Sequence, residues 1–166
     1  MAESVVLLLP VRVALGALFV FAAYLKLSDP QEFVFSINAF DVFDPERQEH
    51  VVNLLAFAVP WAEMVTGLAL ILGVWARGAA ALLAVQLLAF TVAILKVISE
   101  GKEIACGCFG DYEWPCSSPI GWCHVARNAV LFASAALLVW RGAGAISVDG
   151  ALTRPRKALD DDEDDG

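Results

Sequence analysis

Four long apolar stretches, separated by short polar segments, dominate the pattern of the chain. They cover Val5–Leu25, Val51–Ala76, Gly78–Leu95 and Ile120–Trp140. A helix that crosses a bilayer needs roughly 17–25 mainly apolar residues, and each stretch meets that length. We therefore predict an all-α integral membrane four-helix bundle. The second stretch meets the third at Arg77–Gly78, which predicts a tight antiparallel helix hairpin there.

Composition supports the membrane assignment. Hydrophobic residues make up 59% of the 166-residue chain, the mean hydropathy is +0.68, and 18% of residues are charged. Much of the net charge of −8 comes from the acidic run Asp160–Asp165. We predict a transmembrane domain at residues 1–141 and a disordered cytoplasmic tail at 142–166 that ends in this run. Since basic residues form no patch, we expect no nucleic-acid partner.

The connecting segments indicate the orientation. Residues 26–50 combine acidic positions with several phenylalanines, which predicts a folded loop or short helix at the membrane interface. The balance of Lys and Arg between the two sides favours both termini in the cytoplasm, for a multi-pass protein of the cell (inner) membrane. The loop at 99–119 is then extracytoplasmic. A cleaved signal peptide is the rival interpretation of the first stretch, but residues 1–4 contain no Lys or Arg.

All four cysteines lie in or beside that loop, at Cys106, Cys108, Cys116 and Cys123. Disulfides persist in extracytoplasmic compartments, and four cysteines allow three connectivities. A disulfide across the single Gly107 would close a small, strained ring, and strained disulfides are the ones suited to exchange. We therefore predict Cys106 and Cys108 as an exchanging pair, and Cys116 and Cys123 as a resolving or structural pair.

Two other interpretations of the cysteines stay open. Two ordinary disulfides could simply brace the loop against the fourth helix. The cysteines with His124 could also hold zinc or copper(I), although the spacing lacks paired Cys-x-x-Cys motifs, and we assign no metal ligand.

Polar residues inside apolar stretches need partners, because unpaired charge in lipid is costly. Helix-rise arithmetic places Arg12 and Glu63 at similar depths, so we predict an intramembrane ion pair between them, with Gln86 near enough to join. Arg127 and Asn128, below the cysteine loop, could hold a partner group or a quinone headgroup. No other cofactor is expected.

Several of these motifs resemble those of the DoxX-like membrane proteins and their MauE branch, the methylamine utilisation proteins. They are Arg12 with Gly16, Lys26-Leu27 before Asp29-Pro30, Pro60-x-x-Glu63-x-x-x-Gly67, Cys-Gly-Cys-Phe-Gly at 106–110, and Ala126-Arg127-Asn128. The likeness covers about residues 5–141. Cys116, Cys123 and His124 are not recognised as part of the family pattern.

The resemblance implies a four-helix membrane bundle linked to redox maturation of an extracytoplasmic protein, in methylamine metabolism. It implies a thioredoxin-like extracytoplasmic partner and assigns thiol–disulfide exchange to Cys106 and Cys108, as part of a thiol–disulfide oxidoreductase system. The alternative is a non-catalytic accessory or assembly subunit of a membrane complex, with structural disulfides or a metal site.

Overall fold

A computed structural model describes residues 2–42, 47–104 and 115–142. These residues form five α-helices and, within those three ranges, no β-strand, which confirms the all-α prediction. The helices are α1 (Ala2–Ser28), α2 (Pro30–Ala39), α3 (Glu49–Leu72), α4 (Ala76–Ser99) and α5 (Trp122–Arg141). The tail predicted at 142–166 lies outside the described residues from position 143 onward.

Four of the five helices are long and apolar enough to cross a membrane: Leu8–Ser28 within α1, and all of α3, α4 and α5. At 1.5 Å per residue, even the 20-residue α5 is about 30 Å long, the thickness of the hydrocarbon core. Large apolar side chains point outward along them, among them Leu54, Val85 and Val130, each more than 60% exposed. An apolar outer surface of this extent suits lipid, so the chain is a multi-pass membrane protein built as a four-helix bundle.

The turn between α3 and α4 lies at Gly73–Trp75, before the predicted hairpin at Arg77–Gly78. Gly73 has φ 71°, in the left-handed region that glycine tolerates. The Gly73 and Val74 amides donate to the carbonyls of Leu70 and Ala69, which closes the end of α3. The prediction was wrong in position because Val74 and Trp75 are apolar and extend the hydropathic pattern past the glycine that ends the helix.

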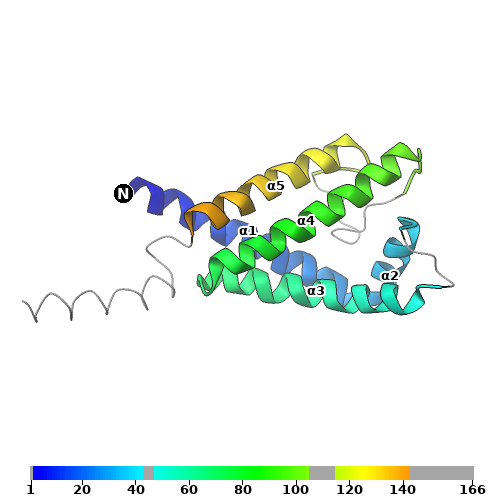
Figure 1. The fold of residues 1–166 in the computed structure, drawn as a ribbon, viewed down its shortest axis with the longest axis horizontal. Helices are drawn as coiled ribbons and strands as arrows, with labels where there is room; N and C mark the ends of the chain where they lie inside the picture. Colours follow the sequence, from blue (N-terminus) through cyan, green and yellow to red (C-terminus); the bar gives the residue numbers. More distant parts are fainter. Residues whose placement is uncertain (1, 43–46, 105–114, 143–166) are drawn as a thin grey trace, which may run out of the picture.

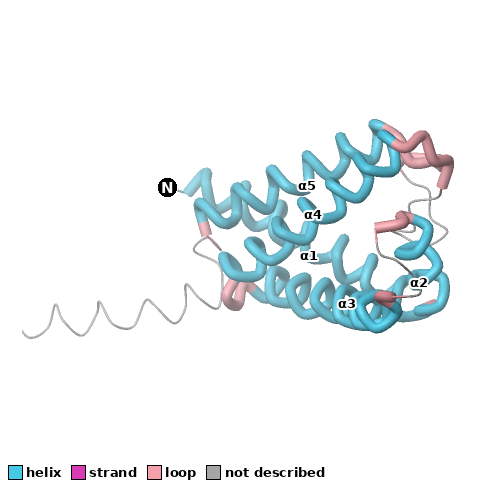
Figure 2. The backbone as a smooth tube through the Cα atoms, turned by 45° about the vertical axis from the view of Figure 1, so that its right-hand side comes forward, coloured by secondary structure: helices cyan, strands magenta, loops and turns pink. Residues whose placement is uncertain are grey.

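The bundle is built from two closely packed pairs, α1 with α3 and α4 with α5, as Figures 1 and 2 show. Gly16 and Gly67 bring α1 and α3 into backbone contact. A Cβ added at Gly16 would lie 2.6 Å from the Gly67 carbonyl oxygen, and one added at Gly67 would lie 2.8 Å from the Gly16 oxygen. Because both positions lack a side chain, the two helices can approach at this level.

The short helix α2 covers one end of the bundle, between the start of α3 and the end of α4 (Figure 1). Asp29 caps it by accepting a hydrogen bond from the Glu32 amide at 3.1 Å, and Pro30 occupies its first turn. Phe40, which follows α2, packs with Ile94 and Val97 of α4 and with Ile120. The segment predicted as an interfacial loop or short helix is therefore a helix docked on the bundle end.

Candidate functional site

A buried ion pair lies between α1 and α3. The Lys26 ammonium donates to both carboxylate oxygens of Glu63 at 2.7 Å, and the two residues are 5% and 2% exposed. Gln86 of α4 donates from its amide nitrogen to Glu63 Oε1 at 2.8 Å. Three of the four spanning helices thus meet at one carboxylate.

The cation that pairs with Glu63 is Lys26 and not Arg12, which corrects the predicted Arg12–Glu63 pair. The contact between Gly16 and Gly67 sets the register of the two antiparallel helices. In that register Arg12 lies beyond Gly67 towards the α3–α4 turn, whereas Glu63 lies on the opposite side of the contact. Arg12 is itself buried, at 3% exposure. The predicted third member, Gln86, does join the network.

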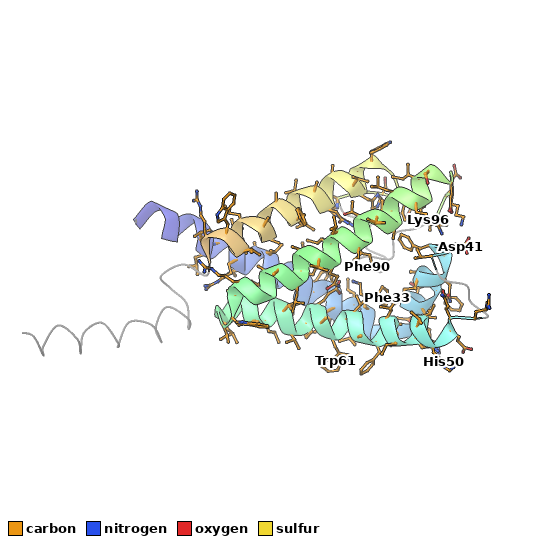
Figure 3. The ribbon with its side chains drawn as sticks, viewed as in Figure 1. Phe33, Asp41, His50, Trp61, Phe90 and Lys96 are labelled. Carbon is orange, nitrogen blue, oxygen red and sulfur yellow. A yellow bond between two sulfur atoms is a disulfide. The ribbon has the colours of Figure 1, made fainter. Side chains whose placement is uncertain are left out.

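Two aromatic rings flank the Lys26 ammonium. Its nitrogen lies 5.1 Å from the centre of the Phe33 ring on α2 and 5.3 Å from that of Phe90 on α4. Figure 3 shows Phe33 and Phe90 close together where α2 meets the bundle. A cation within about 6 Å of a ring face is attracted by the ring quadrupole. The ammonium is therefore held by one carboxylate and two rings, with α2 covering it.

A small cavity opens beside this ion pair. Its volume is about 40 Å³, and Lys26, Glu63, Arg127 and Asn128 line it together with apolar residues of α1, α4 and α5. Asn128 is buried and donates to the Thr91 hydroxyl at 3.4 Å. The structure thus brings the predicted Arg127 and Asn128 to the same site as Glu63. The wall of the cavity is mostly apolar, and its volume exceeds the roughly 10–15 Å³ that one water molecule needs.

The base of the cysteine loop is held together by local bonds. The Ile120 amide donates to the Ile104 carbonyl at 2.9 Å, which joins the two ends of the loop. Cys116 and Cys123 form a disulfide that ties the loop to the first turn of α5. Cys116 is buried, at 4% exposure, whereas Cys123 is exposed. Cys106 and Cys108 lie outside the described residues, within positions 105–114.

His124 stabilises the start of α5. Its Nδ1 accepts a hydrogen bond from the Gly121 amide at 3.2 Å, and its own amide donates to the Gly121 carbonyl. The imidazole therefore satisfies one of the amides exposed at a helix start. Within residues 2–42, 47–104 and 115–142, no three His, Cys, Asp or Glu side chains gather as metal ligands. Cys116 and Cys123, joined in a disulfide, offer no thiolate to a metal.

A cluster of ion pairs connects α2 to the beginning of the loop. Lys102 contacts Asp41 Oδ2 and Glu100 Oε2, each at 2.8 Å, and Lys96 donates to the Asp41 carbonyl. Asp41 and Lys96 lie together at this end of the molecule in Figure 3. The hydrogen bond from Lys102 lowers the pKa of both Asp41 and Glu100, and the bonds to these carboxylates raise the pKa of Lys102. Sequence analysis did not single out this cluster, because its members are far apart along the chain.

Comparison with known proteins identifies the family. The sequence matches the family described as methylamine utilisation protein MauE over residues 4–141. The methylamine utilization protein MauE of Paracoccus denitrificans is 34% identical over 125 residues, which cover 75% of this chain and 63% of that relative. No solved structure matches. The chain therefore belongs to the MauE family, which confirms the resemblance drawn from its motifs.

Proposed function

We propose that the protein takes part in methylamine utilisation as a membrane-embedded thiol–disulfide redox protein that helps an extracytoplasmic protein to mature. The name of its relative supports the first half of this proposal. The observation that supports the second half is the Cys116–Cys123 disulfide at the base of the loop. Disulfides persist in oxidising compartments, so the same loop would present Cys106 and Cys108 to an oxidising environment.

The two pairs of cysteines would have different roles. Cys116 is buried and its disulfide joins the loop to α5, which suits a structural bond. Cys106 and Cys108 would then be the exchanging pair. A thiolate of the maturing protein attacks their disulfide and forms a mixed disulfide with one of the two sulfurs. A second thiolate of that protein resolves it, so the protein leaves with a new disulfide, and Cys106 and Cys108 are left as thiols.

Two electrons and two protons have then moved onto Cys106 and Cys108, and an acceptor must remove them. A thioredoxin-like extracytoplasmic protein in its disulfide form would do so by the same exchange in reverse. The cavity lined by Arg127 and Asn128 has a volume of about 40 Å³. A cavity that holds a single benzene ring measures about 150 Å³. For this reason we assign the acceptor role to the thioredoxin-like partner and not to a quinone in this cavity.

Trapping of the exchange intermediate tests this function. Cys108→Ser leaves Cys106 as a thiol that can attack the disulfide of the thioredoxin-like protein, but no neighbouring thiol can then resolve the product. A mixed disulfide between Cys106 and that protein should therefore accumulate in membranes and be preserved by a rapid acid quench. The matched control is the double variant Cys116→Ser with Cys123→Ser, which should trap nothing. No adduct with Cys108→Ser or Cys106→Ser, while both variants reach the membrane at wild-type level, would overturn the exchange role.

A non-catalytic accessory subunit is the second candidate, and the burial of Cys116 within its disulfide favours it, because a buried disulfide suits a brace of the loop. That role predicts low protein levels in every cysteine variant and no trapped partner. Cysteines that are isolated as free thiols with stoichiometric zinc or copper would instead favour a metal site.

A further inference from the structure

A groove runs between α4 and α5 on the outer surface of the bundle, at the end where the α3–α4 turn lies. Its volume is about 620 Å³. Ala84 and Leu88 of α4 and Phe132 and Ala136 of α5 form part of its wall, while Arg77 and Trp140 lie at one end of it. Figure 1 shows α4 and α5 side by side along their length. We propose that this groove binds one acyl chain of an anionic phospholipid, whose headgroup lies against Arg77.

The length of the groove fits a lipid chain. Arg77 to Leu88 corresponds to about 16 Å along α4 at 1.5 Å per residue, and Phe132 to Trp140 to about 12 Å along α5. The hydrocarbon core is about 30 Å thick, so the groove covers one leaflet. An acyl chain ends at the middle of the bilayer, whereas a helix of a second copy or of a partner would continue through the other leaflet. The groove therefore suits a lipid better than a helix.

The charged end of the groove fits an anionic headgroup. The charged residues of the first turn of α4 and of the last turn of α5 are Arg77 and Arg141, and both are positive and exposed. A Cβ added at Gly142 would lie 2.9 Å from Arg77 Nε, so the guanidinium lies against the end of α5. Trp140, 87% exposed, has the amphipathic ring that proteins place at headgroup level. Basic sites between transmembrane helices recognise anionic lipid headgroups.

Lipid retention by the purified full-length protein tests this site. Native mass spectrometry after exposure to equal amounts of phosphatidylglycerol and phosphatidylcholine with the same acyl chains should show one phosphatidylglycerol retained preferentially. Arg77→Gln should remove that preference, and Val85→Phe, which fills the groove from an exposed position, should reduce retention of both lipids several-fold.

The matched control is Val92→Phe, two helical turns further along α4, because Val92 is similarly exposed but does not line the groove. It should retain lipid like the wild type, and helix content measured by circular dichroism should be equal in all variants. If the wild type, like Arg77→Gln, retained phosphatidylglycerol and phosphatidylcholine equally, the headgroup assignment would be overturned. A dimer that Val85→Phe dissociates, with lipid retention unchanged, would show that a second copy occupies the groove and would overturn the proposal.

Discussion

Lys26 is the residue whose position is hardest to foresee from the sequence. It lies two residues before the end of α1, where lysines commonly extend towards the headgroups. In a helix, however, the Cα–Cβ bond tilts towards the N-terminus, so the side chain of a residue near the end of α1 starts back into the membrane. Glu63 lies in that direction and forms the ion pair with the Lys26 ammonium. Helix-rise arithmetic paired Glu63 with Arg12 because it contained neither this tilt nor the register that the Gly16–Gly67 contact sets.

Removing one member of the pair should be costly, since the other charge stays buried. Glu63→Leu leaves the Lys26 ammonium among Phe33 and Phe90, and breaking a buried ion pair costs roughly 3–5 kcal/mol. We expect a marked fall in the thermal midpoint of the purified protein and in its membrane level. The double variant Lys26→Met with Glu63→Leu replaces both charges by apolar side chains and should recover most of that loss.

The same measurement distinguishes the two candidate cations. Arg12→Leu combined with Glu63→Leu should show no such recovery, because Arg12 is not the ion-pair partner of Glu63. A rescue by the Arg12 change and none by the Lys26 change would contradict the observed pairing.

At the scale of the element, the docking of α2 depends partly on exposed charges and should depend on pH. Because the pKa of Asp41 and Glu100 is lowered by Lys102, their contribution to stability is fully present above the ordinary carboxyl range. The ordinary carboxyl pKa is about 4. The contribution disappears as the pH falls through this value and then through the lowered pKa of the folded state. Lys102 matters at alkaline pH. Because its pKa is raised, its contribution to stability is lost as the pH rises through that pKa.

Asp41→Asn tests how stability depends on pH in the acidic range. Its thermal midpoint should lie below that of the wild type at pH 7, and the difference should vanish at a pH well below 4, where Asp41 is protonated. Glu32→Gln, which removes an exposed acid of α2, is the control and should leave the thermal midpoint at pH 7 close to that of the wild type. A difference between wild type and Asp41→Asn that stays constant across this pH range would show that the charge of Asp41 does not stabilise the docked helix.

The contact between α1 and α3 should tolerate no added side chain. Gly67→Ala places a methyl group about 2.8 Å from the Gly16 oxygen and from Val20, so the helices must separate. Overpacking of this kind costs about 1–3 kcal/mol, and we expect a lower midpoint of thermal unfolding. Ala17→Leu adds a larger group at an exposed position beside Gly16 and should change the midpoint little. Equal effects of the two substitutions would contradict a close contact at the glycines.

For the whole molecule, hydropathy was sufficient to predict four spans and the all-α class, because a bilayer requires long apolar helices. It could not predict which helices pack together, since lipid-facing and buried positions are both apolar here. The Gly16–Gly67 contact and the meeting of Lys26 with Glu63 depend on helix rotation and register, which hydropathy does not contain. The turn at Gly73 was misplaced for the same reason, because its flanking residues are as apolar as the helices.

The distribution of basic residues over the two ends of the bundle predicts the orientation in the membrane. The side with the α3–α4 turn and the end of α5 carries Arg77 and Arg141, followed in sequence by three basic tail residues, Arg154, Arg156 and Lys157. On the opposite side, the Lys26 ammonium is buried within the bundle and so does not count as a loop charge. Because Lys and Arg accumulate on the cytoplasmic side, both termini should be cytoplasmic and the cysteine loop extracytoplasmic.

Reporter fusions measure this orientation directly. A fluorescent protein that matures only in the cytoplasm should be bright when fused after Trp140 and when inserted at Val74, in the α3–α4 turn, and dark when inserted at Glu113. A phosphatase that is active only outside should give the complementary pattern. The two cytoplasmic sites control for each other, because an even number of spans separates any two positions on the same side. Reversed signals at all three positions would place the cysteine loop in the reducing cytoplasm and would remove the compartment argument for the Cys116–Cys123 disulfide.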